Sequence, residues 1–113
     1  MLKKINRLKK KKDFEKVLRE GKGFKEDFLL FKTIKNNLKV SRFGFIISQK
    51  VSKKAVVRNK LKRKTSELVR IKLDKIIKGI DGIFIFSSNL ENKDFWEIEE
   101  IINKIFAKAK TFK

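Results

Sequence analysis

One stretch decides the fold: KVSKKAVVRNKLKRKTSELVR, residues 50–70. At about 100° of rotation per residue, its apolar side chains fall on one stripe and its polar side chains on the opposite side. The stripe consists of Val57, Leu61, Leu68 and Ile71, and the polar side consists of Arg58, Asn59, Lys62, Arg63, Ser66 and Arg70. The stripe extends over about four turns of an amphipathic helix, which packs one face against a core. The helix is predicted to begin near Ser52 and to end near Leu73.

The polar side of this helix carries four cations, an amide and a hydroxyl, with no acid among them. A helix face that is merely solvated usually mixes charges of both signs, because like charges four residues apart repel each other. A face of one sign therefore costs folding free energy, and it suggests an anionic partner. Lys64 falls near the apolar stripe, so we expect its stem to pack and its ammonium group to reach solvent.

Composition narrows the class of protein. The chain has 113 residues, enough for one domain spanning residues 1–113, and its formal net charge is +19. Such self-repulsion indicates a polyanionic partner, namely RNA, DNA or an anionic membrane. The absence of Cys and His excludes disulfides, thiol nucleophiles and the usual zinc sites. No apolar run approaches the roughly 20 residues that span a bilayer, so we expect a cytoplasmic protein.

The N-terminal part predicts a basic arm over residues 1–12, in which Leu2, Ile5 and Leu8 are spaced so that part of the arm can pack. A short helix over residues 14–20 follows, with Asp13 as its N-cap and Gly21 as its stop. The stretch from Gly21 to about residue 27 has the composition of a loop.

Two strands are predicted next, over residues 28–34 and 38–48, and the short turn between them favours an antiparallel hairpin. Gly44 lies in the middle of the second strand, which indicates a bulge or a close approach there. A third strand, residues 81–87, is apolar on both faces and should be central. Asp94 then begins a helix that runs to about residue 110.

The predicted order is α-β-β-α-β-α, a fold of the α+β class (an α/β sandwich) in which helices pack on a small mixed sheet. No catalytic constellation accompanies it, because the acids are scattered and there is no glycine-rich phosphate loop. We expect no catalytic residue in the protein and no metal held by the protein alone. Binding is therefore a better prediction than self-sufficient catalysis.

RNA is the favoured partner. A helix-turn-helix reader of DNA needs a companion helix just before the recognition helix, and here a strand and a loop precede it. Cations with few base-reading amides suit phosphate contacts on folded RNA. A ribosomal or other structural RNA-binding protein fits the same pattern, and a binder of anionic membranes is a third alternative.

The segment Ala55–Arg63 resembles the Arg-Asn-Arg box helix of the protein subunit of bacterial ribonuclease P. The stretch Asn6–Lys10, followed by Asp13, Phe14, Val17 and Gly21, is similar to that family's N-terminal motif, and the element order agrees over nearly the whole chain. The resemblance implies an accessory to a catalytic RNA that uses Mg²⁺ to remove the 5′ leader of precursor tRNA. It also implies a left-handed crossover around the box helix, whereas the generic rule for parallel strands would give a right-handed one.

The resemblance also assigns residues. It implies that catalytic RNA is bound by Arg58, Asn59, Lys62, Arg63, Lys50, Lys53 and Arg70. It implies a leader-binding cleft formed by Phe14, Leu18 and Phe31, and a basic arm with Arg7, Lys9 and Lys10. Mg²⁺ would be bound mainly by the RNA subunit. Ser66 stands where many members carry an arginine, so Lys64 or Arg70 would have to supply that phosphate contact.

Overall fold

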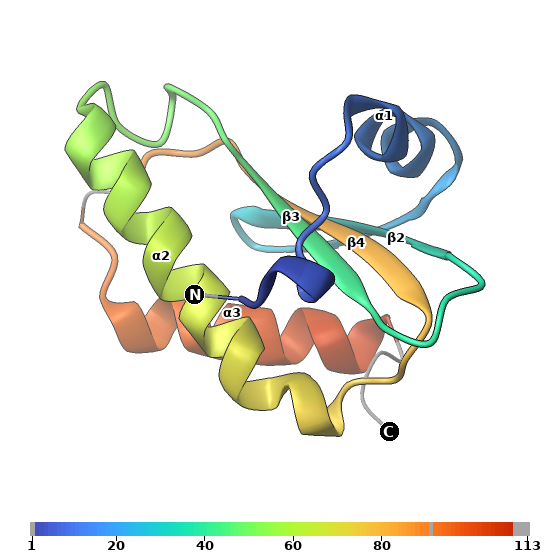
Figure 1. Cartoon of the computed structure of the whole chain (residues 1–113). Helices are drawn as coiled ribbons and strands as arrows, with labels where there is room; N and C mark the ends of the chain where they lie inside the picture. The colour runs from blue at the N-terminus through green and yellow to red at the C-terminus, as the bar shows by residue number, and fades with distance from the viewer. Residues whose placement is uncertain (1, 91, 110–113) are drawn as a thin grey trace.

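The computed structural model describes residues 2–90 and 92–109, which form helices on both faces of a four-stranded sheet (Figure 1). The α-helices are α1 (Lys11–Glu20), α2 (Ala55–Lys72) and α3 (Phe95–Lys108), and short 3₁₀ turns lie at Lys4–Asn6 and Leu73–Lys75. The strands are β1 (Lys22–Glu26), β2 (Leu29–Lys35), β3 (Arg42–Ile47) and β4 (Ile80–Phe86). Helix α1 covers one face of the sheet, and α2 and α3 cover the other. The predicted α+β class is confirmed.

The sheet has the strand order β1-β2-β4-β3 and is mixed. Strand β4 is parallel to β3 and antiparallel to β2, so that Phe84 lies between Phe31 on one side and Phe45 on the other. All but one of its residues are buried, because an apolar run can be satisfied only where both faces are covered. The prediction of a central third strand is confirmed.

The predicted hairpin between the strands at 28–34 and 38–48 is wrong. Strand β4 lies between β2 and β3, and β2 instead turns back onto β1. The segment Lys22–Glu26 was predicted as a loop because of its glycines and charges, but it is an edge strand that exposes Lys22, Gly23 and Lys25. Asp27, with φ of 51°, makes the tight turn of the true hairpin.

The connection from β3 through α2 to β4 is left-handed (Figure 1). The resemblance implied this handedness, and the generic preference for right-handed crossovers did not. Helix α2 lies beside β3, the edge strand along which the N-terminal segment runs.

Helix ends differ in detail from the prediction. Helix α1 begins at Lys11 with Lys10 as its N-cap, so Asp13 lies inside the first turn and does not cap. The stop at Gly21 is confirmed by its N–H, which donates to the carbonyl oxygen of Val17 at 2.8 Å. Helix α3 does follow Asp94, although that side chain makes no capping hydrogen bond.

Two hydrophobic clusters lie on the two faces of the sheet. The larger one, beneath α2 and α3, centres on Phe31, Phe43, Phe84 and Phe106, with ring centroids 4.7–6.3 Å apart. The smaller one, beneath α1, joins Leu8, Val17 and Ile83. The described helices include none long and apolar enough to cross a membrane.

The buried side of α2 is turned relative to the predicted stripe. Leu61 and Leu68 are buried as expected, but Ile71 is 62% exposed. Thr65, Ser66 and Val69 are buried in its place, because the N-terminal segment and β3 cover the side of α2 that carries Ser66. The placement of Ser66 on the exposed cationic side was therefore wrong, since this side chain is only 2% exposed.

Candidate nucleic-acid interface

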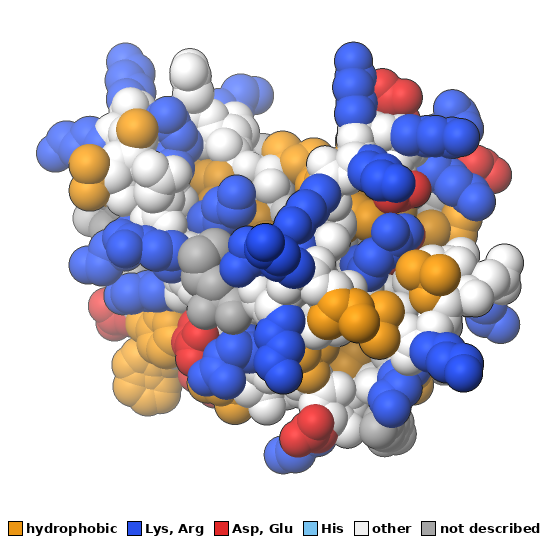
Figure 2. All heavy atoms as spheres, in the orientation of Figure 1, with side chains coloured by type: hydrophobic (Ala, Val, Ile, Leu, Met, Phe, Trp, Pro, Cys, Tyr) orange, Lys and Arg blue, Asp and Glu red, His pale blue; other side chains and the backbone are white. Residues whose placement is uncertain are grey.

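Helix α2 presents its cations over its N-terminal half. Asn59, Lys62 and Arg63 are exposed and surround a shallow hollow that also contains Val56. The helix carries no acid before Glu67, so nothing on α2 itself neutralises this surface. Figure 2 shows these cations continuing onto neighbouring parts of the same face of the molecule. The surface suits contact with phosphate groups.

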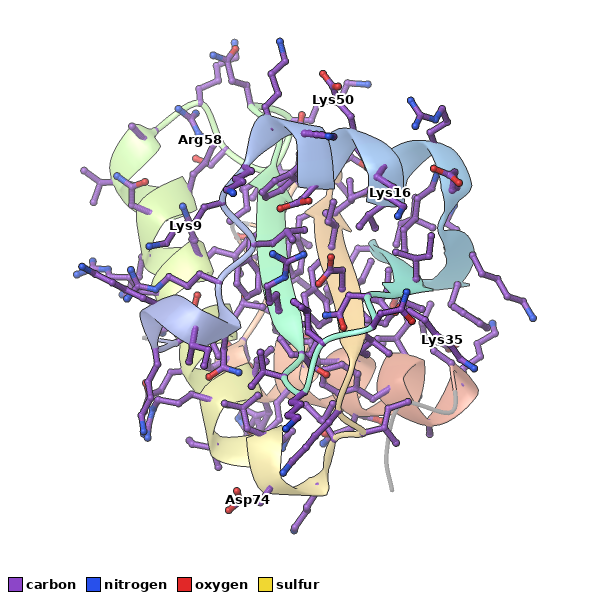
Figure 3. All side chains as sticks on the ribbon, turned by 45° about the vertical axis from the view of Figure 1, so that its right-hand side comes forward. Lys9, Lys16, Lys35, Lys50, Arg58 and Asp74 are labelled. Carbon is purple, nitrogen blue, oxygen red and sulfur yellow. The ribbon has the colours of Figure 1, made fainter. Side chains whose placement is uncertain are left out.

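Arg58 is half-buried rather than fully exposed. Its Nη1 donates a hydrogen bond to the carbonyl oxygen of Ser52 at 2.8 Å, which braces the turn before α2. Lys50 and Lys53 are exposed in that same turn. Lys50 and Arg58 extend from neighbouring parts of this end of the molecule in Figure 3. Lys50 and Lys53 therefore continue the cationic surface of α2 beyond its N-terminus, and Arg58 lies in the first turn of the helix.

Arg70 is engaged by an acid. Its guanidinium group donates to both carboxylate oxygens of Glu67 one turn earlier in α2. Hydrogen bonding to Arg70 is the largest of the causes that lower the pKa of Glu67 to about 2, and the same pair raises the pKa of Arg70. Arg70 therefore lies on the predicted exposed side, but its charge is compensated within the helix.

The N-terminal arm is folded onto the sheet. The N–H of Leu8 donates to the carbonyl oxygen of Phe43 at 2.9 Å, and Arg7 pairs with Phe43 as an isolated parallel bridge. Leu2 and Leu8 are buried while Ile5 is exposed, so packing of part of the arm is confirmed. Arg7 also donates from Nε to the carbonyl oxygen of Leu2 at 2.6 Å. The arm runs along the outer edge of β3 and leaves Lys9 and Lys10 exposed, with Lys9 on the side of α2 (Figure 3).

A groove of about 380 Å³ separates this arm and α1 from α2. Its floor is β3, and Lys9 and Lys62 stand on its opposite walls. The lining residues are Leu2, Arg7, Leu8, Lys9, Phe14, Phe43, Gly44, Phe45, Lys62 and Ser66. Figure 2 shows the hollow between the parts of the surface formed by α2 and α1, with hydrophobic side chains inside it. An apolar floor between cationic walls can accept a base together with its phosphates.

Gly44 allows α1 to approach the floor of this groove. A Cβ atom at position 44 would lie 2.8 Å from Cε1 of Phe14 and closer still to Cζ. The close approach predicted for Gly44 is therefore confirmed. Phe14 lines the groove, whereas Leu18 is half-buried and packs in the cluster beneath α1.

Phe31 does not line this groove, so its assignment to a leader-binding cleft is corrected. Its side chain is 0% exposed and lies on the other face of the sheet, 4.7 Å from Phe84 and 5.7 Å from Phe106 between ring centroids. The stretch Phe28–Phe31 is apolar at four successive positions, and alternation could not show which residues face α1. The groove instead uses Phe43 and Phe45 from β3.

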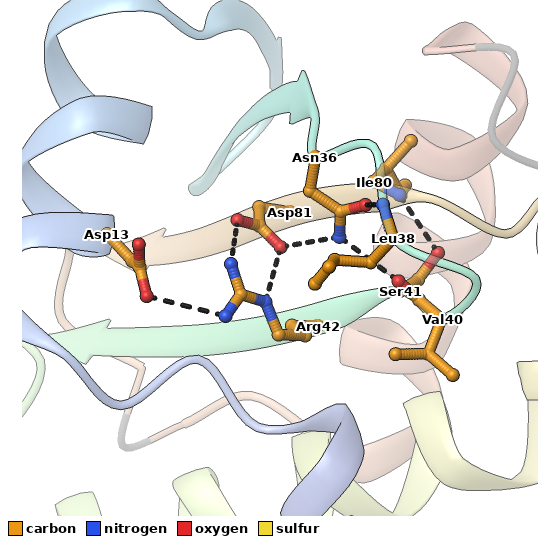
Figure 4. A network of polar contacts seen from close by, with 8 residues as sticks. All are labelled: Asp13, Asn36, Leu38, Val40, Ser41, Arg42, Ile80 and Asp81. Atoms are coloured by element: carbon orange, nitrogen blue, oxygen red, sulfur yellow. Dashed lines mark hydrogen bonds and ion pairs between the residues drawn. The ribbon is translucent and has the colours of Figure 1, made fainter.

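A partly buried ion-pair network links α1 to the sheet (Figure 4). Arg42 donates to the two carboxylate oxygens of Asp81 at 2.9 and 2.6 Å, and its Nη1 lies 3.4 Å from Oδ2 of Asp13 on α1. Asn36 donates to Asp81 at 2.8 Å as well. Hydrogen bonding to Asp81 raises the pKa of Arg42, so this cation stays charged. Asp13 was predicted as an N-cap and residue 81 only as the start of a strand. Neither prediction linked these acids to Arg42, because they lie 29 and 39 positions away from it in the chain.

The described acids do not converge elsewhere. Within residues 2–90 and 92–109, no group of three or more Asp or Glu side chains is placed to hold a metal ion. The acids that do meet a partner mostly pair with Lys or Arg, as Glu99 does with Lys72 and Glu100 with Lys104. The described surface is therefore suited to binding anions.

Comparison with known proteins shows which family the chain resembles. The model of the family described as Ribonuclease P matches residues 2–110. A ribonuclease P protein component from Clostridium botulinum is 38% identical over 107 residues, covering 94% of this chain and 96% of the relative. One from Fusobacterium nucleatum is 36% identical over 110 residues, covering 94% and 98%.

Solved structures agree with this likeness. An RNase P protein from Staphylococcus aureus, a mutant with defective mRNA degradation activity, superposes with a TM-score of 0.89 at 26% identity, covering 96% of this chain and 92% of that one. The RNase P protein from Thermotoga maritima gives a TM-score of 0.81 at 32% identity, covering 90% and 96%. The chain belongs to the ribonuclease P protein family.

Proposed function

We propose that this chain is the protein subunit of ribonuclease P and acts in tRNA processing by binding RNA. Its box residues Arg58, Asn59, Lys62 and Arg63 contact the catalytic RNA, and the groove beside Phe14 receives the single-stranded 5′ leader of precursor tRNA. The proposal rests mainly on one observation: the cationic half of α2 borders a groove with an apolar floor and a lysine on each wall. One chain can thus hold two RNA segments side by side.

In this proposal the RNA subunit carries the catalysis and no protein side chain acts as a catalytic residue. Mg²⁺ bound by the RNA supplies the hydrolytic chemistry at the phosphodiester. The protein contributes positive charge, which offsets phosphate repulsion when leader and catalytic RNA approach each other. Cleavage should therefore depend most strongly on the protein when the Mg²⁺ concentration is low.

The test is reconstitution with the cognate catalytic RNA. Adding the full chain should speed cleavage of precursor tRNA at low Mg²⁺, and the gain should shrink as Mg²⁺ is raised. No acceleration at any Mg²⁺ concentration would contradict the proposal. Co-sedimentation with ribosomal subunits, without preference for leader-bearing tRNA, would favour a structural RNA-binding protein instead.

Arg58→Ala separates RNA affinity from folding. We expect a loss of about 1–3 kcal/mol in affinity for the catalytic RNA, because a charged hydrogen-bond donor is removed. The lost bond to the Ser52 carbonyl should cost only about 1 kcal/mol of folding free energy. Binding assays and urea denaturation of the same variant measure the two quantities. A collapse of the folded state would show that Arg58 is mainly structural.

A further inference from the structure

A second groove lies on the other side of α2, between α2 and the start of α3. Its volume is about 260 Å³, and it is lined by Val51, Val57, Lys60, Leu61, Lys64, Leu90, Lys93, Phe95 and Ile98. Lys60 and Lys64 stand one turn apart on α2, on the side away from Lys62, which lines the first groove. Three lysines and no described acid line this groove, although Lys93 also lies 3.7 Å from Glu97.

Two large aromatic side chains stand exposed where α3 begins: Phe95 lines this groove, and Trp96 follows it in the chain, outside the lining. Phe95 is 38% exposed and Trp96 is 67% exposed, both in the first turn of α3. The ammonium group of Lys64 lies 5.1 Å from the centroid of the Phe95 ring, so the lysine that did not fit the α2 pattern packs here. Figure 2 shows hydrophobic side chains gathered at this end of α3, below the cations of α2. Exposed aromatic surface beside lysines usually marks a binding surface.

We propose that this groove binds an unpaired stretch of RNA, with one base stacked on Phe95, the next base on Trp96 just outside the groove, and the adjoining phosphates on Lys60 and Lys64. Aromatic faces accept any base, and lysines track the backbone. A second copy of this chain is a poor occupant, because two chains of net charge +19 repel each other. The inference goes beyond the proposed function, since this groove lies on the opposite side of α2 from the one beside Phe14.

Trp96 supplies its own probe, because it is the only tryptophan in the chain and there is no tyrosine. We expect short oligoadenylate to quench Trp96 fluorescence in the full-length chain, since stacking brings a base onto the indole ring. An abasic sugar-phosphate oligomer of equal length should leave the fluorescence unchanged. Quenching by the abasic oligomer, or none by oligoadenylate, would overturn the proposal.

The variant Lys60→Gln/Lys64→Gln tests the phosphate contacts while keeping side-chain length. The midpoint of quenching should rise by about tenfold, and the slope of log affinity against log salt should become shallower by about 1.4, at about 0.7 per contact on a single strand. The matched control Lys35→Gln/Lys39→Gln removes the same charge from exposed positions at the far end of β2. Equal shifts in the two variants would show only general attraction and would overturn the proposal. Melting curves confirm that both variants fold.

Two further outcomes separate this inference from the proposed function. A change in Trp96 emission with anionic vesicles but not with oligoadenylate would assign the groove to a lipid surface and overturn the proposal. Stimulated precursor cleavage without quenching would remove this inference alone. Quenching without stimulation would support this inference and count against the proposed function.

Discussion

At the scale of single residues, Gly44 sets how closely α1 can approach the sheet. Gly44→Ala would force the Phe14 ring out of its present place, because no ordinary Cβ contact is as short as the one it would make. We expect a loss of about 1–3 kcal/mol in unfolding free energy, the usual cost of overpacking, together with weaker leader binding. Urea denaturation measures the first effect and binding of leader-bearing tRNA measures the second.

Gly23→Ala is the matched control for Gly44→Ala. An added Cβ there would lie 3.6 Å from Cδ1 of Leu30, which is ordinary contact. This variant should be neutral or slightly stabilising, because alanine restricts the unfolded chain more than glycine does. A similar loss in both variants would show that the Phe14 contact is not the cause.

A substitution of Glu67 tests whether its pairing with Arg70 limits RNA binding. Glu67→Gln should release the Arg70 guanidinium for phosphate and strengthen binding to the catalytic RNA. Glu100→Gln on α3 removes an acid that is also paired with a cation, Lys104, but lies away from the proposed interface, and it should change affinity less. An equal gain in RNA affinity in the two variants would show that net charge alone is responsible and that Arg70 makes no specific contact.

The same pair has a pH signature. The pKa of Glu67 is lowered from 4.5 to about 2, so its carboxylate form is favoured in the folded state. The stabilisation is therefore fully present above about pH 4.5 and is lost as the pH falls towards 2. The difference in Tm between the parent chain and Glu67→Gln should shrink across that window. A difference that does not change with pH would contradict the ion pair.

At the scale of elements, the Arg42 network holds α1 against the sheet. Arg42→Gln would leave the buried Asp81 carboxylate without its bidentate partner, which should cost about 3 kcal/mol of folding free energy. Asp13→Asn breaks only the longer, more exposed contact and should cost less than about 1 kcal/mol. Denaturation curves compare the two, and equal losses would contradict the central place given to Asp81.

Prediction from sequence was strongest where the information is local. The box segment of α2 and the doubly apolar β4 follow from patterns within a few neighbouring residues. Strand order was predicted wrongly, because insertion of β4 between β2 and β3 depends on pairs of residues that lie 39 to 57 positions apart in the chain. The face of Phe31 was missed for a related reason, since a run of apolar residues carries no alternation to read.

The candidate site was predicted in part. The cations of α2 and Phe14 do border one groove, whereas Ser66, Ile71 and Phe31 were placed on the wrong sides. A helical pattern shows how the side chains of α2 are arranged around the helix axis. It does not show which side of the helix the N-terminal arm will cover. Arg42 was overlooked because one cation among 32 carries no signal until its acids are brought to it.

At the scale of the whole molecule, a net charge of +19 gives salt opposite effects on folding and on binding. Added salt should raise the Tm of the free chain by screening self-repulsion. The same salt should weaken RNA binding, with log affinity falling against log salt at a slope of roughly −3 to −5 if about five phosphates are neutralised. Melting curves and binding titrations over the same series of salt concentrations test the expected rise in Tm and the expected fall in RNA affinity. A Tm that falls with salt would show that attractive ion pairs outweigh the repulsion.

The arm along β3 has a consequence for experiments that shorten the chain. By pairing with Phe43, residues 7 and 8 occupy part of a strand edge that would otherwise offer free N–H and carbonyl groups to another molecule. A chain lacking its first nine residues would expose that edge to self-association and would also lose one wall of the groove. Weakened RNA binding by such a truncated chain would therefore have three causes: aggregation, loss of one wall of the groove and loss of positive charge. Only a point substitution such as Lys9→Gln measures the effect of the charge by itself.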